Sequence, residues 1–232
     1  MIPRIIHQTW KDADVPARFR AAQASWRDAH PAWEYRFWSD QDLDALVRES
    51  APGVLPLYQR YPEQIQRVDA ARYVILREFG GLYADLDLHC LRAFDDLLDH
   101  DVVLPRTTPF GLSNQLMLAV PGHPLFRRVV EDLPIGFRRW QRPWFPRHLR
   151  VLASTGPLFL TGRFRAYGST DGFRILSLEE HCHGKPAKNR VRSLRGNTWA
   201  RWDSHVINFF HENWPWLTAT GAAAAVATAL LT

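Results

Sequence analysis

Residues Val68–Leu88 read VDAARYVILREFGGLYADLDL and change their hydrophobic period at a double glycine. Before the glycines, apolar residues recur at the three-and-four spacing of an amphipathic helix, namely at Val68, Ala71, Ile75 and Phe79. After the glycines the spacing becomes two, which is typical of a strand. Because glycine ends helices readily, the stretch predicts a helix, a tight turn and a strand in direct succession.

The predicted helix places an arginine on its apolar side. At about 100° per residue, Arg72 falls inside the apolar arc, and Asp69 lies at its edge one turn away. An arginine that faces a core is costly unless its charge is paired and its donors are satisfied. Either the two side chains form an intrahelical pair that only stabilises the helix, or both reach past the helix end to a polar ligand above the following strand.

The predicted strand separates apolar from polar side chains. One face would carry Leu82, Ala84, Leu86 and Leu88, and the other Tyr83, Asp85 and Asp87. Two carboxylates about 7 Å apart at the backbone repel each other and raise one pKa unless a cation joins them. Since Mn²⁺ and Mg²⁺ take oxygen ligands from carboxylates and phosphates, the D-x-D pair predicts a divalent cation that holds a diphosphate. A solvated edge strand is the alternative.

Four segments of the chain resemble one enzyme family. They are Ile2–Trp10 (IPRIIHQTW), Arg67–Asp87 with its D-x-D pair, Leu152–Thr161 (LASTGPLFLT) and Phe209–Trp216 (FFHENWPW), in which Pro215 replaces a serine of the family pattern. On these residues the chain is similar to glycosyltransferase family 32, which includes fungal mannosyltransferases acting on inositol phosphorylceramide and many bacterial polysaccharide enzymes. The resemblance implies an α/β fold of the GT-A type, which is a Rossmann-like mixed sheet flanked by helices in a single domain.

The resemblance also implies a metal-dependent donor site. Asp87 would bind Mn²⁺ or Mg²⁺ directly, and Asp85 would bridge the ribose, the sugar and a metal-bound water. His211 would be a third protein ligand for the metal, although nearby His205 competes for that role. Together with Arg72, the two carboxylates would form the catalytic group.

Further contacts are implied by the other matching segments. The donor would lie against Asp69, Arg72 and a set of residues near the first strand, the double glycine and the middle of the chain: His7, Gln8, Thr9, Trp10, Gly81, Tyr83, Asp85 and Asn114. The first strand is a suitable place, because the carboxyl ends of strands form the ligand crevice of an open α/β sheet. The acceptor would lie against Asn114, Thr155, Gly156 and Trp214. Asn114 could equally be a turn residue, and Pro157 could begin a helix.

The implied activity is transfer of a hexose, with mannose favoured, and with retention at the anomeric carbon. The donor would be GDP-mannose or a UDP-hexose, and the acceptor a lipid-linked sugar or another saccharide. A phosphatase is disfavoured, because His89 stands where such a D-x-D motif has threonine or valine. Two alternatives stay open. A protein could be the acceptor, since residues 211–213 spell the H-E-N signature of arginine-modifying effectors, or the chain could be an inactive module that binds a nucleotide or lipid.

The composition fits one catalytic domain. A chain of 232 residues, of which 46% are hydrophobic, can bury the core of a single α/β domain. We expect that domain to span residues 1–216 and to be followed by an apolar tail at residues 217–232. Strands and helices are expected in alternation, with strands at Ile2–Gln8, Trp33–Trp38, Asp101–Leu104 and Gln115–Val120, and helices at Ala17–Ala29, Asp40–Glu49 and Pro124–Leu133.

A basic and aromatic segment, Phe137–Arg150 (FRRWQRPWFPRHLR), stands out in a chain of net charge +5. Such a mixture suits a membrane surface with anionic headgroups, where each nearby arginine contributes about 1 kcal/mol. The same side chains could hold single-stranded nucleic acid, or the arginines could stack on their own aromatic neighbours. Because no nucleic-acid-binding motif is recognised, we expect a peripheral membrane contact and no nucleic acid.

The N-terminal sequence has no charged leader followed by a long apolar run, so we expect no signal peptide, and the two cysteines, Cys90 and Cys182, lack C-x-x-C spacing. We therefore expect reduced thiols in a cytoplasmic protein, located at the inner face of the cell membrane. The apolar run Ala219–Leu231 is shorter than the roughly 20 residues that a membrane-spanning helix needs. It could be a terminal helix packed on the domain, an interfacial anchor or the start of a membrane segment.

Overall fold

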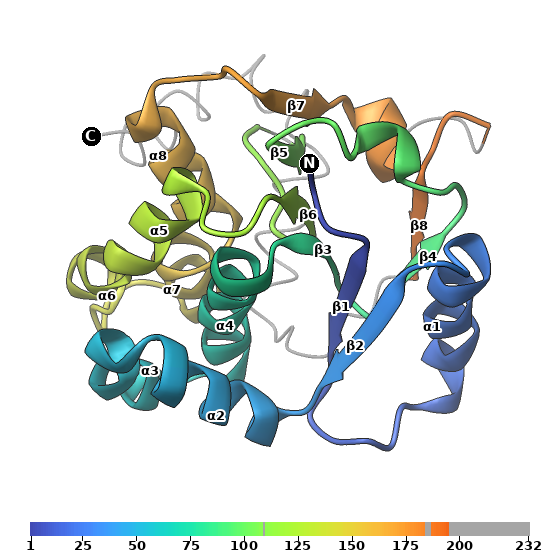
Figure 1. Cartoon of the computed structure of the whole chain (residues 1–232). Coiled ribbons are helices and arrows are strands. Elements are labelled where there is room, and N and C mark those ends of the chain that lie inside the picture. Colours follow the sequence, from blue (N-terminus) through green and yellow to red (C-terminus); the bar gives the residue numbers. More distant parts are fainter. Residues whose placement is uncertain (109, 184–186, 195–232) are drawn as a thin grey trace, which may run out of the picture.

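The computed structural model describes residues 1–108, 110–183 and 187–194, which form helices packed around a central sheet (Figure 1). The sheet has six strands in the order β2-β1-β3-β6-β5-β7. They are β1 (Ile5–Thr9), β2 (Glu34–Trp38), β3 (Gly81–Ala84), β5 (Val102–Pro105), β6 (Leu116–Ala119) and β7 (Phe173–Leu176). β1 is parallel to β2 and β3, whereas β6 is antiparallel to β3 and β5. The sheet is therefore mixed, as expected.

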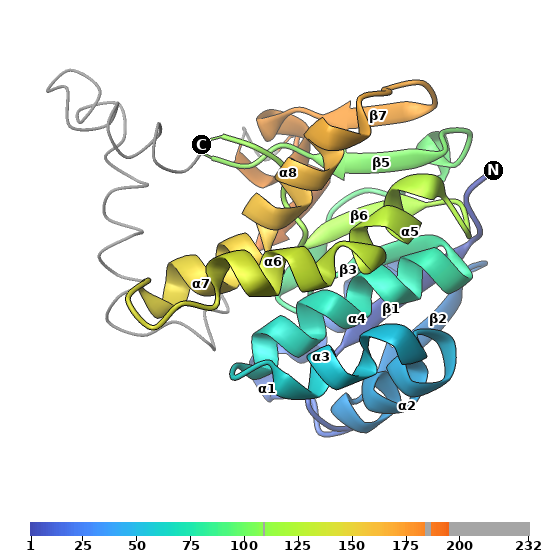
Figure 2. The ribbon, with the colours of Figure 1, turned by 90° about the vertical axis from the view of Figure 1, so that its left-hand side faces the viewer.

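Helices cover both faces of this sheet (Figure 2). One face carries α2 (Asp40–Ser50), α3 (Leu55–Arg60), α4 (Gln64–Phe79), α5 (Pro124–Glu131), α6 (Leu133–Trp140), α7 (Arg147–Ser154) and α8 (Pro157–Tyr167). The other carries α1 (Ala17–Ala29) and a two-stranded ribbon of β4 (Leu88–Cys90) and β8 (Val191–Ser193). Short helical segments lie at Pro52–Val54, Asp95–Leu97 and Glu179–His183.

Alternate side chains of β3 enter two separate cores. Leu82 and Ala84 belong to the core that contains Trp26 of α1, whereas Tyr83 belongs to the core that contains Ile75 of α4. This is the two-faced packing that the period-two pattern of the sequence predicts. The polar edge of the Tyr83 ring is thereby brought to the same side of the sheet as α4.

The double glycine between α4 and β3 is required by its surroundings. Gly80 and Gly81 have φ values of +62° and +82°, which side chains other than glycine rarely adopt. A Cβ at Gly80 would lie 2.6 Å from the nitrogen of Pro121, and one at Gly81 would lie 2.6 Å from the carbonyl oxygen of Ile5. Because the chain reverses here, the carboxyl end of β3 lies beside the first half of α4.

The expected strand over the D-x-D pair is wrong. β3 ends at Ala84, and Asp85–Asp87 forms a turn closed by a bond from the Leu88 nitrogen to the Asp85 oxygen, at 3.0 Å. The chain then enters β4, which pairs with β8 in the other sheet. The reason lies in Leu86, which is 4% exposed and packs in a small apolar cluster of its own with Val15 and Phe19.

Most other expected elements are confirmed apart from their end residues. The helix expected over Pro124–Leu133 instead breaks at Asp132, and α6 starts afresh at Leu133. Pro134 explains the break, because proline lacks an N–H and its ring clashes with the preceding turn of a helix. The expectation that Pro157 begins a helix is confirmed, since it is the first residue of α8.

Several expectations fall on the chain outside the described residues: His205, His211, Trp214 and the tail at 217–232. The division into a domain and a tail thus stays a prediction. In the described ranges, no helix combines the length and the apolar character needed to cross a bilayer. Both cysteines are free thiols, with Cys90 buried and Cys182 half-buried.

Candidate active site

Arg72 occupies the centre of the site, where α4 meets the carboxyl end of β3. Its side chain is 2% exposed and forms ion pairs with Asp69, at 3.1 Å between Nη2 and Oδ1, and with Asp85, at 3.1 Å between Nη1 and Oδ1. Nη1 also donates to the backbone oxygen of Asn114 at 2.8 Å. The intrahelical Asp69–Arg72 pair is therefore present, and the same guanidinium also reaches the D-x-D turn; contact of the pair with a ligand stays a prediction.

Asp69 is fully engaged by protein groups. Its Oδ1 accepts from Asn114 Nδ2 at 3.0 Å, and its Oδ2 accepts from Thr155 Oγ1 at 3.1 Å. Burial raises the pKa of Asp69 above its ordinary value, and Arg72 and the two hydrogen bonds act against that shift. Both carboxylate oxygens are thus used inside the protein, so Asp69 joins α4 to the segment before β6 and to the α7–α8 junction.

Two further residues of α4 extend this network, and sequence reasoning missed both. The Tyr73 hydroxyl donates to the backbone oxygen of Thr155 at 2.7 Å, and Gln66 Nε2 donates to Ser154 Oγ at 2.7 Å. Gln66, Asp69 and Tyr73 follow the spacing i, i+3, i+7, so they form one polar stripe on the helix. That stripe, inside an otherwise buried helix, was the signal that could have revealed them.

Tyr83 orients the carboxylate of Asp85 through a hydrogen bond. Its hydroxyl donates to Asp85 Oδ1 at 2.9 Å and lies 3.1 Å from Thr9 Oγ1. The Arg72 guanidinium stacks over its ring, with Cζ 4.7 Å from the ring centroid, where the negative face of the ring attracts a cation. Gln8 Nε2 donates to the backbone oxygen of Asp85 at 3.4 Å. The orientation of the first D-x-D carboxylate is therefore determined by contacts from β1, β3 and α4.

The D-x-D turn supplies two carboxylates, which are part of the ligand set that a divalent cation needs. Burial raises the pKa of Asp85 to about 7; the charge of Arg72 lowers it, and the charge of Asp87 raises it again. A divalent cation would relieve this conflict between neighbouring carboxylates. The residues that the structure describes contain no group of three or more metal-binding side chains, so two carboxylates would leave positions for phosphate oxygens and water. The donor set fits Mn²⁺ or Mg²⁺ held jointly with a diphosphate.

His7 does not have the position that a contact with the donor needs. It is completely buried, and its Nε2 lies 3.1 Å from the Gly80 oxygen while its Nδ1 accepts from Trp38 Nε1 at 3.2 Å. Burial, helped by the charge of Arg36, lowers its pKa to about 3, so the ring is neutral. Both ring nitrogens are used within the protein, so His7 supports the glycine turn.

The remaining predicted residues fall into two groups. Gln8, Thr9, Tyr83, Asn114, Thr155 and Gly156 are buried in or beside the network, and Gly81 forms the turn. Trp10 is half-buried at the end of β1, and within the described part of the chain its indole Nε1 has no hydrogen-bond partner. The structure thus brings five of the candidates together around Arg72, mostly as buried supports, namely Asp69, Tyr83, Asp85, Asn114 and Thr155.

Solved structures of similar fold are glycosyltransferases. The UDP-bound glycosyltransferase domain from the YGT toxin superposes with a TM-score of 0.56 and 9% identity, covering 76% of this chain and 79% of its own. At that identity the likeness concerns the fold alone. Together with the mixed sheet and its flanking helices, it identifies a single-domain GT-A fold.

Curated relatives match nearly the whole chain. "Inositol phosphoceramide mannosyltransferase 3" of Schizosaccharomyces pombe is 42% identical over 224 residues, which are 95% of this chain and 62% of that protein. "Mannosyl phosphorylinositol ceramide synthase CSH1" of Saccharomyces cerevisiae is 36% identical over 214 residues, which are 89% of this chain and 55% of that protein. The chain therefore spans less than two thirds of the length of these relatives.

The region around the D-x-D turn also matches a defined protein family. Residues 16–104 correspond to the family described as "Glycosyltransferase sugar-binding region containing DXD motif". This range contains α4, the double glycine and both D-x-D carboxylates. By this match and by its relatives, the chain belongs to the glycosyltransferases of family 32 and is related to mannosyltransferases.

Proposed function

We propose that the chain is a metal-dependent, retaining hexosyltransferase that uses a nucleotide-diphosphate sugar, with GDP-mannose favoured over a UDP-hexose. The observation that carries this proposal is the position of Arg72, whose guanidinium bridges Asp69 of α4 and Asp85 of the D-x-D turn. The buried guanidinium of Arg72, next to two carboxylates that could bind a metal, is suited to stabilising a diphosphate leaving group. Mannose is favoured because the relatives are named as mannosyltransferases.

The roles of the D-x-D residues follow from their contacts. Asp87 is the proposed direct metal ligand, because it is the second carboxylate of the D-x-D motif, which usually binds the metal in the family that the chain resembles; Asp85 is oriented by Tyr83 and Arg72. Asp85 would contact the ribose, the sugar and a metal-bound water through its remaining exposure of 30%. When bound, Mn²⁺ or Mg²⁺ would stabilise negative charge on the departing diphosphate. His211 stays a candidate third ligand.

Arg72 would act by preorganisation. Its charge is aligned before any ligand arrives, by Asp69 on one side and by the Asn114 oxygen on the other. A fixed cation stabilises developing negative charge without the cost of reorganising at the moment of reaction. For retention, we propose that the acceptor attacks from the face that the diphosphate leaves, a route that needs no nucleophile from the protein.

The proposed acceptor is a lipid-linked sugar or another saccharide, and the names of the relatives favour a phosphoinositol lipid. Asn114, Thr155 and Gly156 would shape the acceptor side through the buried network, and Trp214 would contact the acceptor directly. A protein acceptor and an inactive binding module stay as the alternatives. A cytoplasmic location stays a prediction that rests on the two free cysteines.

Release of the nucleotide diphosphate tests the proposal. Purified protein is incubated with GDP-mannose, UDP-glucose or UDP-galactose, with Mn²⁺ or with EDTA, and the released GDP or UDP is measured. We expect turnover with one donor, dependent on Mn²⁺, lost in Asp87→Ala and kept in the control Asp99→Ala, which changes an exposed aspartate elsewhere. The anomeric proton coupling of the product, by NMR, tests retention.

Two outcomes would contradict the proposal. Full turnover in Asp87→Ala would remove the D-x-D turn from the metal site. Stabilisation by a nucleotide sugar without any turnover, over a range of saccharide and lipid acceptors, would favour the inactive binding module.

A further inference from the structure

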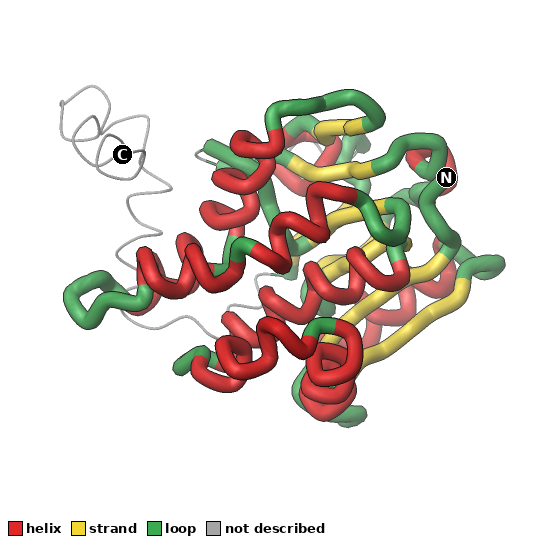
Figure 3. Tube along the Cα trace, turned by 60° about the vertical axis from the view of Figure 1, so that its left-hand side comes forward, coloured by secondary structure: helices red, strands yellow, loops and turns green. Residues whose placement is uncertain are grey.

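The helices α6 and α7, with the connecting residues 141–146, form an antiparallel pair that we call the basic hairpin. It projects from the body of the domain, toward the left in Figure 2 and with its loop at the far left in Figure 3. Between Asp132 and Asp171 the sequence has seven arginines and no acidic residue. The projection thus carries positive charge without carboxylates of its own.

Two acidic residues near the base of the basic hairpin pair with arginines other than Arg138 and Arg142. Glu63 pairs with Arg147 at 2.8 Å, and Asp132 pairs with Arg163 at 2.8 Å. Within residues 1–108, 110–183 and 187–194, no salt bridge involves Arg138 or Arg142, and both side chains are exposed. Arg142 stacks on the neighbouring Trp144, with Cζ 5.8 Å from the ring centroid, and the two exposed guanidinium groups remain accessible to an external partner of opposite charge.

The same projection exposes large apolar side chains. Five such residues are exposed in the described part of the chain, and two of them, Ile135 at 42% and Trp144 at 73%, belong to the basic hairpin. Trp144 belongs to an aromatic group around Phe145. The ring centroid of Phe145 lies 6.4 Å from that of Trp144 and 5.2 Å from that of Trp140. Tryptophan prefers the boundary between lipid headgroups and acyl chains, so the tip has the composition of an interfacial anchor.

A cleft of about 420 Å³ between α3 and α6 adjoins this surface. Its lining combines three arginines, Arg60, Arg138 and Arg142, with the apolar Leu57 and Phe137. Arg60 stacks on Phe137, with Cζ 5.3 Å from the ring centroid. Guanidinium groups beside apolar side chains match a phosphate that is attached to a glycerol and acyl chain.

We propose that the basic hairpin and the adjoining cleft are a docking surface for a membrane that contains anionic phospholipids. Trp144 enters the headgroup region, and Arg60, Arg138 and Arg142 bind lipid phosphates. The exposed tryptophan and the apolar side chains in the cleft lining favour a membrane over single-stranded nucleic acid, which would need stacking platforms along a groove.

Docking in this way deepens the proposed function and rests on it, because it presupposes an acceptor carried by a membrane. Within the basic hairpin, α7 runs from the connecting residues 141–146 to Thr155, whose hydroxyl donates to Asp69 at 3.1 Å. The surface and the candidate active site are therefore the two ends of one helix. A membrane held by the basic hairpin would lie next to the acceptor side of the site.

Flotation of the full chain with lipid vesicles tests the docking surface. The vesicles are phosphatidylcholine alone, or phosphatidylcholine mixed with phosphatidylglycerol. We expect binding to the mixed vesicles only, and weaker binding as salt shortens the range of electrostatic attraction. The double variant Arg138→Gln/Arg142→Gln should lower the partition coefficient about 30-fold, because each arginine near an anionic surface contributes about 1 kcal/mol. Trp144→Ala should also weaken binding.

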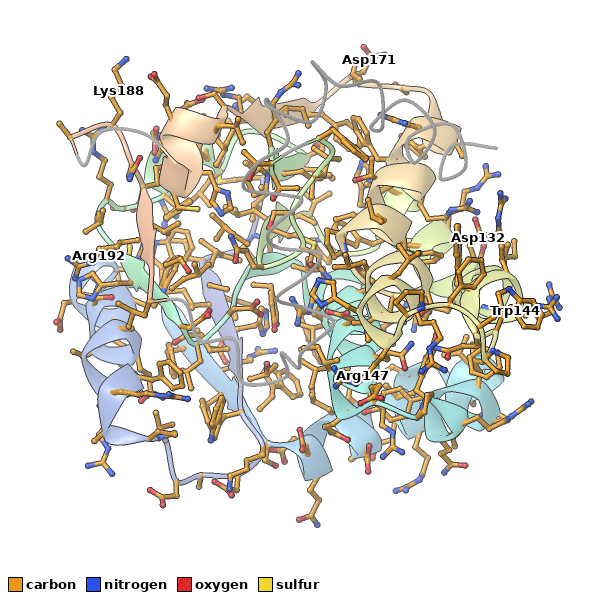
Figure 4. All side chains as sticks on the ribbon, turned by 180° about the vertical axis from the view of Figure 1, so that it is seen from behind. Asp132, Trp144, Arg147, Asp171, Lys188 and Arg192 are labelled. Carbon is orange, nitrogen blue, oxygen red and sulfur yellow. The ribbon has the colours of Figure 1, made fainter. Side chains whose placement is uncertain are left out.

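The matched control removes two positive charges from the opposite side of the molecule. Lys188→Gln/Arg192→Gln changes the net charge equally, and Figure 4 shows both residues far from Trp144. We expect this control to bind like the unmodified chain, and release of the nucleotide diphosphate without vesicles should be equal in all variants.

Three results would overturn the docking surface: no binding of the unmodified chain to mixed vesicles, equal binding of the Arg138/Arg142 variant, or displacement from vesicles by single-stranded oligonucleotide but not by soluble glycerophosphoglycerol. Normal nucleotide release in those cases would leave the proposed function standing. Vesicle binding that depends on the basic hairpin, in a chain without turnover, would support the surface and refute the activity.

Discussion

Replacing Asp69 with asparagine removes one charge from a buried ion pair while keeping the size of the side chain. The Asp69 and Arg72 side chains are 6% and 2% exposed. Removing one partner of a buried pair costs about 3–5 kcal/mol, because the other charge loses its compensation. Arg72 keeps Asp85 at 3.1 Å and the Asn114 oxygen at 2.8 Å, so we expect the lower part of that range, about 3 kcal/mol.

Thermal unfolding in EDTA, followed by circular dichroism, measures this cost without a metal. In a chain of this size, each 1 kcal/mol moves the melting temperature by about 2–4 °C, so Asp69→Asn should lower it by about 6–12 °C. The exposed Asp99→Asn is the matched control and should change stability by less than about 0.5 kcal/mol. A fall of less than about 2 °C in Asp69→Asn would refute the reasoning, since it would mean that the carboxylate contributes little to the network.

Three other perturbations probe the supports of the site. Gly81→Ala should destabilise the fold by about 1–3 kcal/mol from backbone strain alone, and by more because its Cβ would lie 2.6 Å from the Ile5 oxygen. Urea denaturation measures this loss of stability, and an unchanged denaturation midpoint would contradict the turn geometry. Leu86→Ala should lower the free energy of unfolding by about 2–5 kcal/mol. It should also weaken the binding of GDP with Mn²⁺, measured by calorimetry, although both carboxylates remain. Unchanged affinity would show that the Leu86 cluster does not orient the turn. Burial lowers the pKa of His7 from 6.5 to about 3, so its contribution to stability is complete above pH 6.5. The free energy of unfolding then falls by roughly 1.4 kcal/mol per pH unit as the pH drops toward 3. When the free energy of unfolding is measured by urea denaturation at several pH values, its dependence on pH should be shallower in His7→Gln.

The order of elements could be predicted because hydrophobic period is a local property. The change from a three-and-four spacing to a spacing of two around Gly80 and Gly81 determined α4 and β3 before any contact was known. The course of the chain after Ala84 could not be predicted in the same way. It depends on Leu86 meeting Val15 and Phe19, and no local pattern reports a contact between segments so far apart in the sequence.

The candidate site shows the same division. Arg72 stood out because an arginine on an apolar helix face demands partners, and its contacts with Asp69 and Asp85 answer that demand. His7 was expected where the first strand ends, but it is the central residue of β1, and its burial and its bond to Trp38 depend on the neighbouring strand. Tyr73 gave no signal by itself, because a tyrosine in a buried helix is ordinary until its hydroxyl finds Thr155.

Binding of Mn²⁺ tests the central claim, that the D-x-D turn holds a metal together with a nucleotide diphosphate. The electron paramagnetic resonance signal of free Mn²⁺ is followed during titration with protein, with and without GDP or UDP, for the unmodified chain, Asp87→Ala and Asp99→Ala. We predict that the free signal disappears up to one Mn²⁺ ion per chain when the preferred nucleotide is present. The Mn²⁺ affinity should be unchanged in Asp99→Ala and about tenfold or more weaker in Asp87→Ala, which corresponds to about 1.4 kcal/mol. Equal Mn²⁺ affinity in Asp87→Ala and the unmodified chain would contradict the account.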